Sequence, residues 1–136
     1  MISSYNASAI TVATDAAYTF DTNRISTGCT VGHAAGTSTF TLNKPGYYYV
    51  SFNTTFTTTD TGIATVELRN GATPVPGAIG SETITTAGDT KSIAFATIVK
   101  VLPSCAAIDN TTTLTFVATG IDLTVSTAAV NITKLC

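Results

Sequence analysis

Residues 44–57 read KPGYYYVSFNTTFT, and this stretch decides the fold class of the chain. Pro45-Gly46 is a turn signal. After the turn, apolar and polar side chains alternate with period two, which is typical of a β-strand with one buried face. The apolar positions are Tyr48, Val50, Phe52 and Phe56. We therefore expect a long strand with one face in a hydrophobic core.

The opposite face of this strand is polar except for two tyrosines, Tyr47 and Tyr49. A tyrosine combines an apolar ring with a hydroxyl group, and such residues suit interfaces that are partly wet. Two interpretations of this pair are open. Either the tyrosines lie in a seam between copies of the chain, which we favour, or they stack on sugar rings or on a partner's surface.

The same alternation recurs along the chain and is interrupted by clusters of Gly, Pro, Asn or Asp, while the 3.6-residue period of a helix is absent. Further positions expected in the core are Val66, Leu68, Phe95, Val99, Leu114 and Phe116. Strands are expected at residues 9–14, 18–20, 39–42, 47–58, 63–70, 82–86, 90–102, 112–118 and 128–135. This pattern predicts an all-β protein built as a two-sheet antiparallel sandwich.

The length of 136 residues fits one domain over residues 1–136, because most domains are of about this size. Residues 1–8 are expected to be an N-terminal arm. Asn70-Gly71 offers the pair that a type I′ hairpin turn favours. In the following segment, Pro74 and Pro76 cannot both donate to a central ladder, so residues 72–77 are expected at a sheet edge or a loop rim.

The composition points to self-association. Hydrophobic residues make up 44% of the chain, charged residues only 10%, and the formal net charge is −2. Such a sparsely charged surface promotes association. The six basic residues are too few for a nucleic-acid-binding face. The longest apolar runs are far shorter than the ~20 residues of a spanning helix, so no membrane insertion is expected.

Four short patterns occur in an order that matches a known superfamily: FxL at 40–42, PGYYYVxF at 45–52, VxLxNG at 66–71 with VPG at 75–77, and an amphipathic strand at 93–101. Together they resemble the C1q/TNF-like jelly roll, over roughly residues 9–135. Within that superfamily the chain is most similar to bacterial and phage versions, such as the globular C-terminal domain of the collagen-like spore-surface glycoprotein of bacilli. The Gly-X-Y stalk of those proteins is missing from this chain.

The resemblance implies a jelly-roll sandwich that forms a homotrimer, with one sheet of each protomer facing the threefold axis and both chain ends at the base. Closed cyclic symmetry is also a physical solution for a face that must be covered, because it buries the patch without growth into a fibre. The first partner expected is therefore the chain itself.

Catalytic, metal and cofactor sites are not expected. The single histidine, His33, lies in a Gly/Ala-rich segment without a Gly-x-Ser-x-Gly elbow and is expected to be an exposed loop residue. The eight carboxylates are scattered in sequence, so a glycosidase pair is not predicted. Asp109-Asn110 is the best local donor pair for calcium, but a solvated turn is the favoured interpretation. No cofactor is predicted.

Three cysteines are present, Cys29, Cys105 and Cys136, and none has a zinc-like spacing. An odd number leaves two readings open: one disulfide plus one free or interchain thiol, or small buried thiols. Cys136 is the last residue in the sequence and is the candidate for an interchain bond. The N-terminus has neither a basic region nor an apolar region, so no signal peptide is expected.

These observations favour a non-enzymatic, trimeric display module on a bacteriophage virion, as a decoration protein or a head or tail fibre. Its role would be surface attachment or contact with a host glycan or protein, beside other virion or surface-layer proteins. The alternative is a spore- or cell-surface domain of a Gram-positive bacterium. A secreted carbohydrate-active enzyme is the third and least favoured interpretation, and it would need a deep cleft with two carboxylates.

Overall fold

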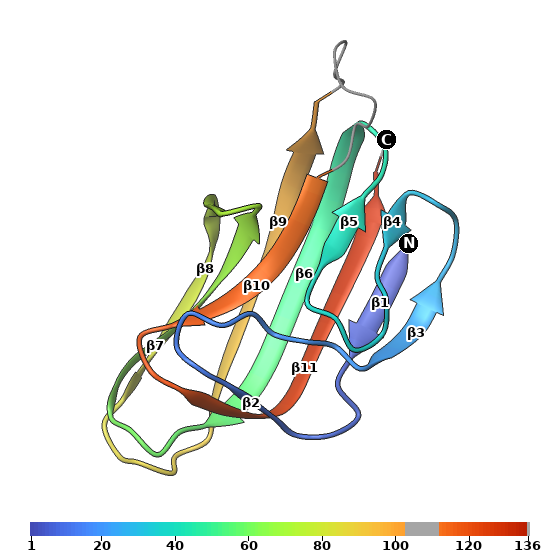
Figure 1. The fold of residues 1–136 in the computed structure, drawn as a ribbon. Coiled ribbons are helices and arrows are strands. Elements are labelled where there is room, and N and C mark those ends of the chain that lie inside the picture. Colours follow the sequence, from blue (N-terminus) through green and yellow to red (C-terminus); the bar gives the residue numbers. More distant parts are fainter. Residues whose placement is uncertain (103–111, 136) are drawn as a thin grey trace.

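The computed structural model describes residues 1–102 and 112–135, and within them the chain is all-β. Eleven strands form two antiparallel sheets that pack face to face (Figure 1). The two-sheet antiparallel sandwich predicted from the sequence is confirmed. Asp109-Asn110, Cys105 and Cys136 lie outside the described residues.

The first sheet, here called the β6 sheet, has the order β3-β1-β11-β6-β9, and β2 pairs with a further part of β11. Its strands are β1 (Ile2–Tyr5), β2 (Ile10–Val12), β3 (Thr22–Ser26), β6 (Gly46–Thr57), β9 (Lys91–Val101) and β11 (Leu123–Lys134). The stretch that decides the fold class thus becomes β6, which lies between β11 and β9.

The second sheet, here called the β7 sheet, has the order β4-β5-β10-β7-β8. Its strands are β4 (Val31–Gly32), β5 (Phe40–Leu42), β7 (Gly62–Asn70), β8 (Thr73–Ile84) and β10 (Thr112–Thr119). Strand β8 lies at the edge of this sheet, as the two prolines indicate. Within β8, Gly80 has no room for a Cβ because the Ile93 side chain of β9 lies against it.

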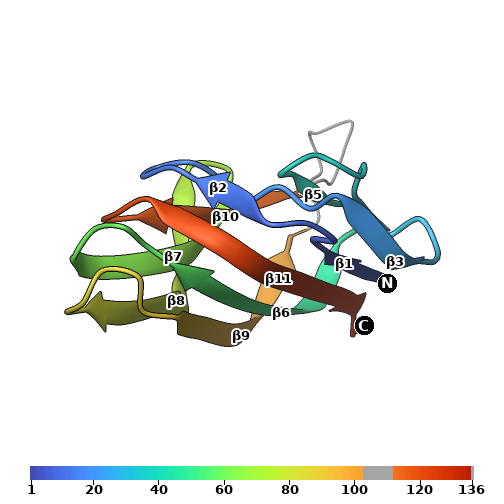
Figure 2. The same cartoon turned by 90° about the horizontal axis from the view of Figure 1, so that it is seen from below.

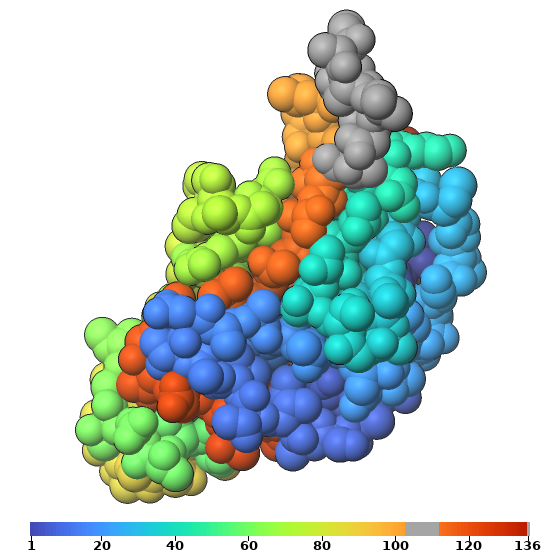
Figure 3. Space-filling model, viewed as in Figure 1, coloured from blue at the N-terminus to red at the C-terminus, as the bar shows by residue number. Residues whose placement is uncertain are grey.

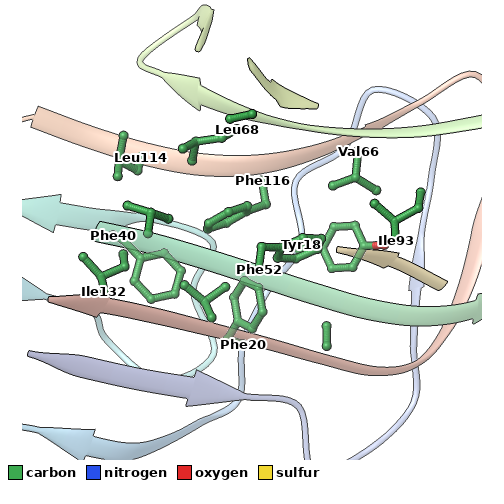
Figure 4. Packing of buried hydrophobic residues seen from close by; sticks show 14 of the residues in the cluster. Tyr18, Phe20, Phe40, Phe52, Val66, Leu68, Ile93, Leu114, Phe116 and Ile132 are labelled. Carbon is green, nitrogen blue, oxygen red and sulfur yellow. The ribbon is translucent and has the colours of Figure 1, made fainter. Parts of the chain in front are cut away.

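The core between the sheets contains the apolar positions of the alternating strands (Figure 4). Phe52 of β6 and Phe116 of β10 stack at 4.8 Å between ring centroids and join the two sheets. Of the residues expected in the core, Phe95 is partly buried and packs against the core. The others are buried: Tyr48, Val50, Phe52, Phe56, Val66, Leu68, Val99, Leu114 and Phe116.

The segment between β2 and β3 crosses from one sheet to the other and closes the sandwich (Figure 2). It starts beside β11, and the Tyr18 amide then donates to the Phe116 carbonyl of β10 at 2.7 Å. The residues expected as a strand at 18–20 do not form one, and only Phe20 among them makes an isolated bridge, to Thr37. Both Tyr18 and Phe20 are buried in the core. On the molecular surface the segment (blue) lies beside β10 (orange) in Figure 3.

Three expectations about local structure need correction. Residues 1–8 are not a separate arm, since β1 pairs with both β11 and β3, and Ile2 is buried. The hairpin after β7 turns at Gly71-Ala72, because Asn70 pairs with Thr73 and the positive φ of 62° is at Gly71. A type II′ turn requires a positive φ at its first central residue, and Gly71 provides it, so the turn is of type II′ rather than type I′.

The third correction concerns β8, which was expected only at 82–86. It begins at Thr73 and contains a wide irregularity, since Glu67 pairs with Ile79 whereas Arg69 pairs with Pro74. The prolines are accommodated in this irregularity because the strand lies at the sheet edge, where an amide without a partner can face solvent.

Candidate functional site

The outward side of the β6 sheet is the surface most suited to binding another molecule. The alternation that buries Tyr48 and Val50 turns Tyr47 and Tyr49 outward, and their exposed fractions are 43% and 42%. On the neighbouring strand β9, Ile98 is 57% exposed. Exposed aromatic and branched apolar side chains on adjacent strands form an apolar patch that is normally covered in a working protein.

The strand register fixes which side chains are neighbours on this surface, here called the β6 outer face. Tyr49 lies opposite Ile98 of β9 and Thr133 of β11. The next outward row joins Ala96, Ser51, Asn131 and Ser3. The row after it joins Ala94, Asn53, Ala129 and Tyr5. The β6 outer face therefore consists of small, hydroxyl-bearing, amide and aromatic side chains.

Charged side chains are confined to the margins of the β6 outer face. The outward positions of β6 and β11 contain no Asp, Glu, Lys, Arg or His. At one margin, Lys100 Nζ lies 5.6 Å from the centre of the Tyr47 ring, and at the other, Arg24 Cζ lies 4.7 Å from the centre of the Tyr5 ring. Both cations are within cation–π range of a tyrosine. The central area of the face is uncharged.

A hollow of about 300 Å³ lies in the β6 outer face where β1, β3, β6 and β11 meet. It is lined by Met1, Ile2, Ser3, Arg24, Ile25, Tyr49, Asn131 and Thr133. A second, larger groove of about 530 Å³ separates β9 from the hairpin that begins β8, with Pro74, Val75 and Ile98 among its walls. Both depressions share residues with the β6 outer face or border it, so the face is not a flat surface.

The structure places both tyrosines singled out in the sequence, Tyr47 and Tyr49, on this surface. Sequence reasoning missed Ile98, although a signal was present: Ile98 is apolar but lies between the inward positions Thr97 and Val99. It also missed the hollow, since that depends on β1 joining the sheet. The expected interchain thiol, Cys136, lies outside the described residues, and Cys29 is exposed and free.

The groups considered for catalysis or metal binding are engaged in the fold or scattered. His33 is not an exposed loop residue: its ring is half-buried and stacks on Phe40 at 4.2 Å, because the segment after β4 packs against the core. The Asp122 carboxylate accepts hydrogen bonds from the Thr14 amide and hydroxyl, which lower the pKa of that carboxyl. Within residues 1–102 and 112–135, no group of three His, Cys, Asp or Glu side chains is arranged to hold a metal ion.

In the part of the chain that the structure describes, no helix is long and apolar enough to cross a membrane.

No protein-family model matches the chain, and no curated protein matches it. Solved structures do match over almost its whole length. The Eiger TNF of S. frugiperda has a TM-score of 0.68 at 12% identity, and the match covers 99% of this chain and 92% of that one. The PRD1 vertex protein P5 has a TM-score of 0.61 at 16% identity, with 99% and 96% covered.

Murine APRIL, in a crystal structure at pH 5.0, has a TM-score of 0.61 at 10% identity, with 98% of each chain covered. These identities are low, so the likeness concerns the fold alone: the chain has the TNF-like jelly roll of these structures.

Proposed function

We propose that this chain is a non-enzymatic structural module that works as a homotrimer on the surface of a bacteriophage particle, in attachment or host contact. The observation that carries the proposal is the β6 outer face, whose central area has exposed aromatic and apolar side chains and no charge. Such a face suits burial against further copies of the same chain, since an uncharged surface loses little hydration on contact.

A closed ring of copies would cover the β6 outer face of every protomer. The β6 outer face of one protomer can meet a different surface of the next, and a rotation that closes leaves no uncovered copy of the face. The β8–β9 edge borders the face through Ile98 and Lys100. In such a ring the tyrosines Tyr47 and Tyr49 lie in the seam, and the β7 sheet faces outward.

The placement on a virion is supported by the likeness to the PRD1 vertex protein, which shares the fold over nearly the full length of both chains. The same arrangement leaves the loops at the ends of the sandwich for contact with a host glycan or protein. Other virion proteins would hold the end where Ile2 of β1 and Ile132 of β11 pair and both chain ends lie close together.

A cryo-electron microscopy map of the native particle tests this proposal. The expected result is density for three copies around a threefold axis, with β6 outer faces turned inward and the trimer on the capsid or a fibre. Density on a spore or cell surface would overturn the virion placement. A copy whose β6 outer face is open to solvent in the particle would overturn the assembly itself.

A further inference from the structure

The two ends of strand β6 differ in charge, and three lysines surround its start. Lys100 of β9 pairs with Tyr47, and Lys134 of β11 pairs with Tyr48. Lys44 lies just before β6, where its carbonyl accepts a hydrogen bond from the Tyr48 hydroxyl at 2.6 Å. The start of β6 and the ends of β9 and β11 lie at the same end of the sandwich in Figure 1. This end, with Lys44, Lys100 and Lys134, is here called the lysine end.

The other end of β6 has the opposite charge, and three aspartates lie around Thr58. The Thr58 hydroxyl donates to the Asp122 carbonyl at 2.9 Å and accepts from the Asp60 amide at 3.2 Å. Asp89 follows a glycine whose amide donates to the Thr58 carbonyl at 2.8 Å. Lys91, at the start of β9, is the basic residue of this end. Basic residues therefore prevail at one end of β6 and acidic residues at the other.

The charges at the two ends are too far apart to neutralise each other. The ends are separated by most of β9, a strand of 11 residues, which is about 30 Å at the usual rise per residue. Salt screens charges over about 8 Å at physiological ionic strength. Among the described residues the three lysines form no ion pair, whereas Arg69 pairs with Glu67 at 2.6 Å. Asp109 is outside the described residues, and one carboxylate would leave the lysines in excess. The charge of the lysine end is therefore available to a partner.

Exposed apolar side chains lie among these lysines. Leu102, directly after β9, is 64% exposed, and Leu135, directly after β11, is 51% exposed. The Leu135 amide donates to the Tyr47 carbonyl at 2.7 Å, which fixes this leucine beside the start of β6. Contacts between proteins commonly combine an apolar centre with a polar rim. The lysine end has both parts, because its two leucines are bordered by cations.

We propose that the lysine end docks on an acidic protein surface. The lysine ammonium groups pair with carboxylates of the partner and steer its approach, and Leu102 and Leu135 add burial of apolar area. Tyr47 stays in the seam between copies, so docking and trimer formation use different residues. The inference rests on the proposed function for one point, that the partner is a virion protein. The binding itself does not depend on where the protein is found.

The size of the charged area favours a protein over a membrane or a nucleic acid. Anionic membranes are recognised by clusters of roughly four to eight basic residues, and the lysine end of one protomer has three. A membrane or a nucleic acid also presents negative charge over an extended area, where it would meet a chain whose formal net charge is −2. An acidic patch on a protein can match the lysine end alone.

Fluorescence anisotropy with two labelled acidic peptides of equal length and charge tests this inference near neutral pH. One peptide has Leu between its glutamates, and the other has Ser in the same places. The Glu/Leu peptide should bind more tightly, and its affinity should fall about tenfold or more between about 0.05 and 0.5 M sodium chloride. Absence of binding would overturn the proposal. Tighter binding of phosphatidylglycerol vesicles or of duplex DNA than of the Glu/Leu peptide would overturn the choice of a protein partner.

Matched variants locate the binding on the lysine end. Lys44→Glu and Lys91→Glu make the same change in charge at opposite ends of the sandwich. Lys44→Glu should weaken the Glu/Leu peptide by about fivefold or more, whereas Lys91→Glu should bind it like the parent. Leu135→Ser should remove the preference for the Glu/Leu peptide over the Glu/Ser peptide. Equal weakening by the two lysine variants, or a preference that persists in Leu135→Ser, would overturn the proposal.

The peptide assay and the particle map fail independently. Circular dichroism of each variant confirms that it is folded before its binding is compared. A protein found on a spore surface, or one that is monomeric, would still bind the Glu/Leu peptide through its lysine end. Loss of the proposed function therefore leaves this inference testable, and absence of peptide binding leaves the trimer on the virion untouched.

Discussion

The outer faces of the two sheets are built on the same alternation but differ in character. On the β7 sheet, the outward positions of β7 include Glu67 and Arg69, which form an ion pair at 2.6 Å. On the β6 sheet, the corresponding positions hold Tyr49, Ser51 and Asn53, and the partners on β11 and β9 are equally uncharged. Both sheets bury their inward side chains in one shared core.

The difference between the two outer faces is one of charge, because the β7 sheet also exposes the apolar side chains of Ile63 and Ile79. Both sheets contribute side chains to the buried core, so core burial does not indicate which sheet forms the contact between copies. The outward residues carry that information, because a charged pair is stable in water and costly at an interface without compensation. An uncharged face with exposed Tyr and Ile has the opposite preference. The proposed contact between copies is therefore assigned to the β6 outer face.

The largest effect is expected where both sheets depend on one residue. Phe52→Asp puts a carboxylate into the stack with Phe116, and a buried ionised group costs several kcal/mol. The variant should lack a cooperative thermal transition in circular dichroism. Thr83→Asp, at an exposed position of β8 away from the β6 outer face, is the control and should melt as a folded protein. A Phe52→Asp protein with the parent's melting curve would show that the faces are wrongly assigned.

The second prediction separates the two outer faces directly. Ala96 and Ser81 are both exposed residues on edge strands, but Ala96 belongs to the β6 outer face and Ser81 to the β7 sheet. Ala96→Arg should weaken association by at least about tenfold, because it places an unpaired charge in the contact. Ser81→Arg should associate like the parent in sedimentation velocity. Equal behaviour of the two variants contradicts the assignment.

The third prediction concerns the segment that joins the sheets. Burial raises the pKa of Tyr18 to about 12, with the Thr54 hydroxyl acting in the opposite direction. An unfolded chain loses the phenol proton near pH 10. The stability supplied by the neutral phenol is therefore present below about pH 10 and lost as the pH rises toward 12, by roughly 2–3 kcal/mol. Urea unfolding of Tyr18→Phe across this range should show a smaller loss; an equal loss in both proteins would refute it.

The smallest effect is expected on the β7 sheet. Glu67→Gln removes the ion pair with Arg69, whose side chains are 14% and 28% exposed. An ion pair near the surface contributes about 0–1 kcal/mol. Urea unfolding should move by no more than this, and the oligomeric state should stay unchanged. Dissociation of the Glu67→Gln protein would mean that the β7 sheet takes part in the contact between copies, which would contradict the assignment to the β6 outer face.

Much of the fold could be predicted from the sequence because the side-chain period is visible in it. In β6, the positions from Tyr48 to Phe56 have two separable faces, and the structure buries the apolar one. The partners of the strands could not be predicted in this way. The pairing of β1 with β11 joins residues about 130 positions apart, such as Ile2 and Ile132, and no local pattern records it.

The candidate site was predicted only in part, because some of its residues follow from the local sequence pattern and others depend on strand register. Tyr47 and Tyr49 could be singled out because they interrupt a polar face, but Ile98 needed the register that sets it opposite Tyr49. The hydrogen bonds among Ser4, Asn23 and His33 could not be predicted, since these residues come from three separate segments. A type I′ turn was predicted from Asn70-Gly71, whereas the ladder continues through Asn70 and moves the turn by one residue.

The mass of the native protein in solution, measured by sedimentation equilibrium at micromolar concentration, tests the central claim most directly. If the β6 outer face is buried between three copies, the mass is about 42 kDa, three times the 13.9 kDa of one chain. A single species of 13.9 kDa would mean that this face is open to water, and it would contradict the account.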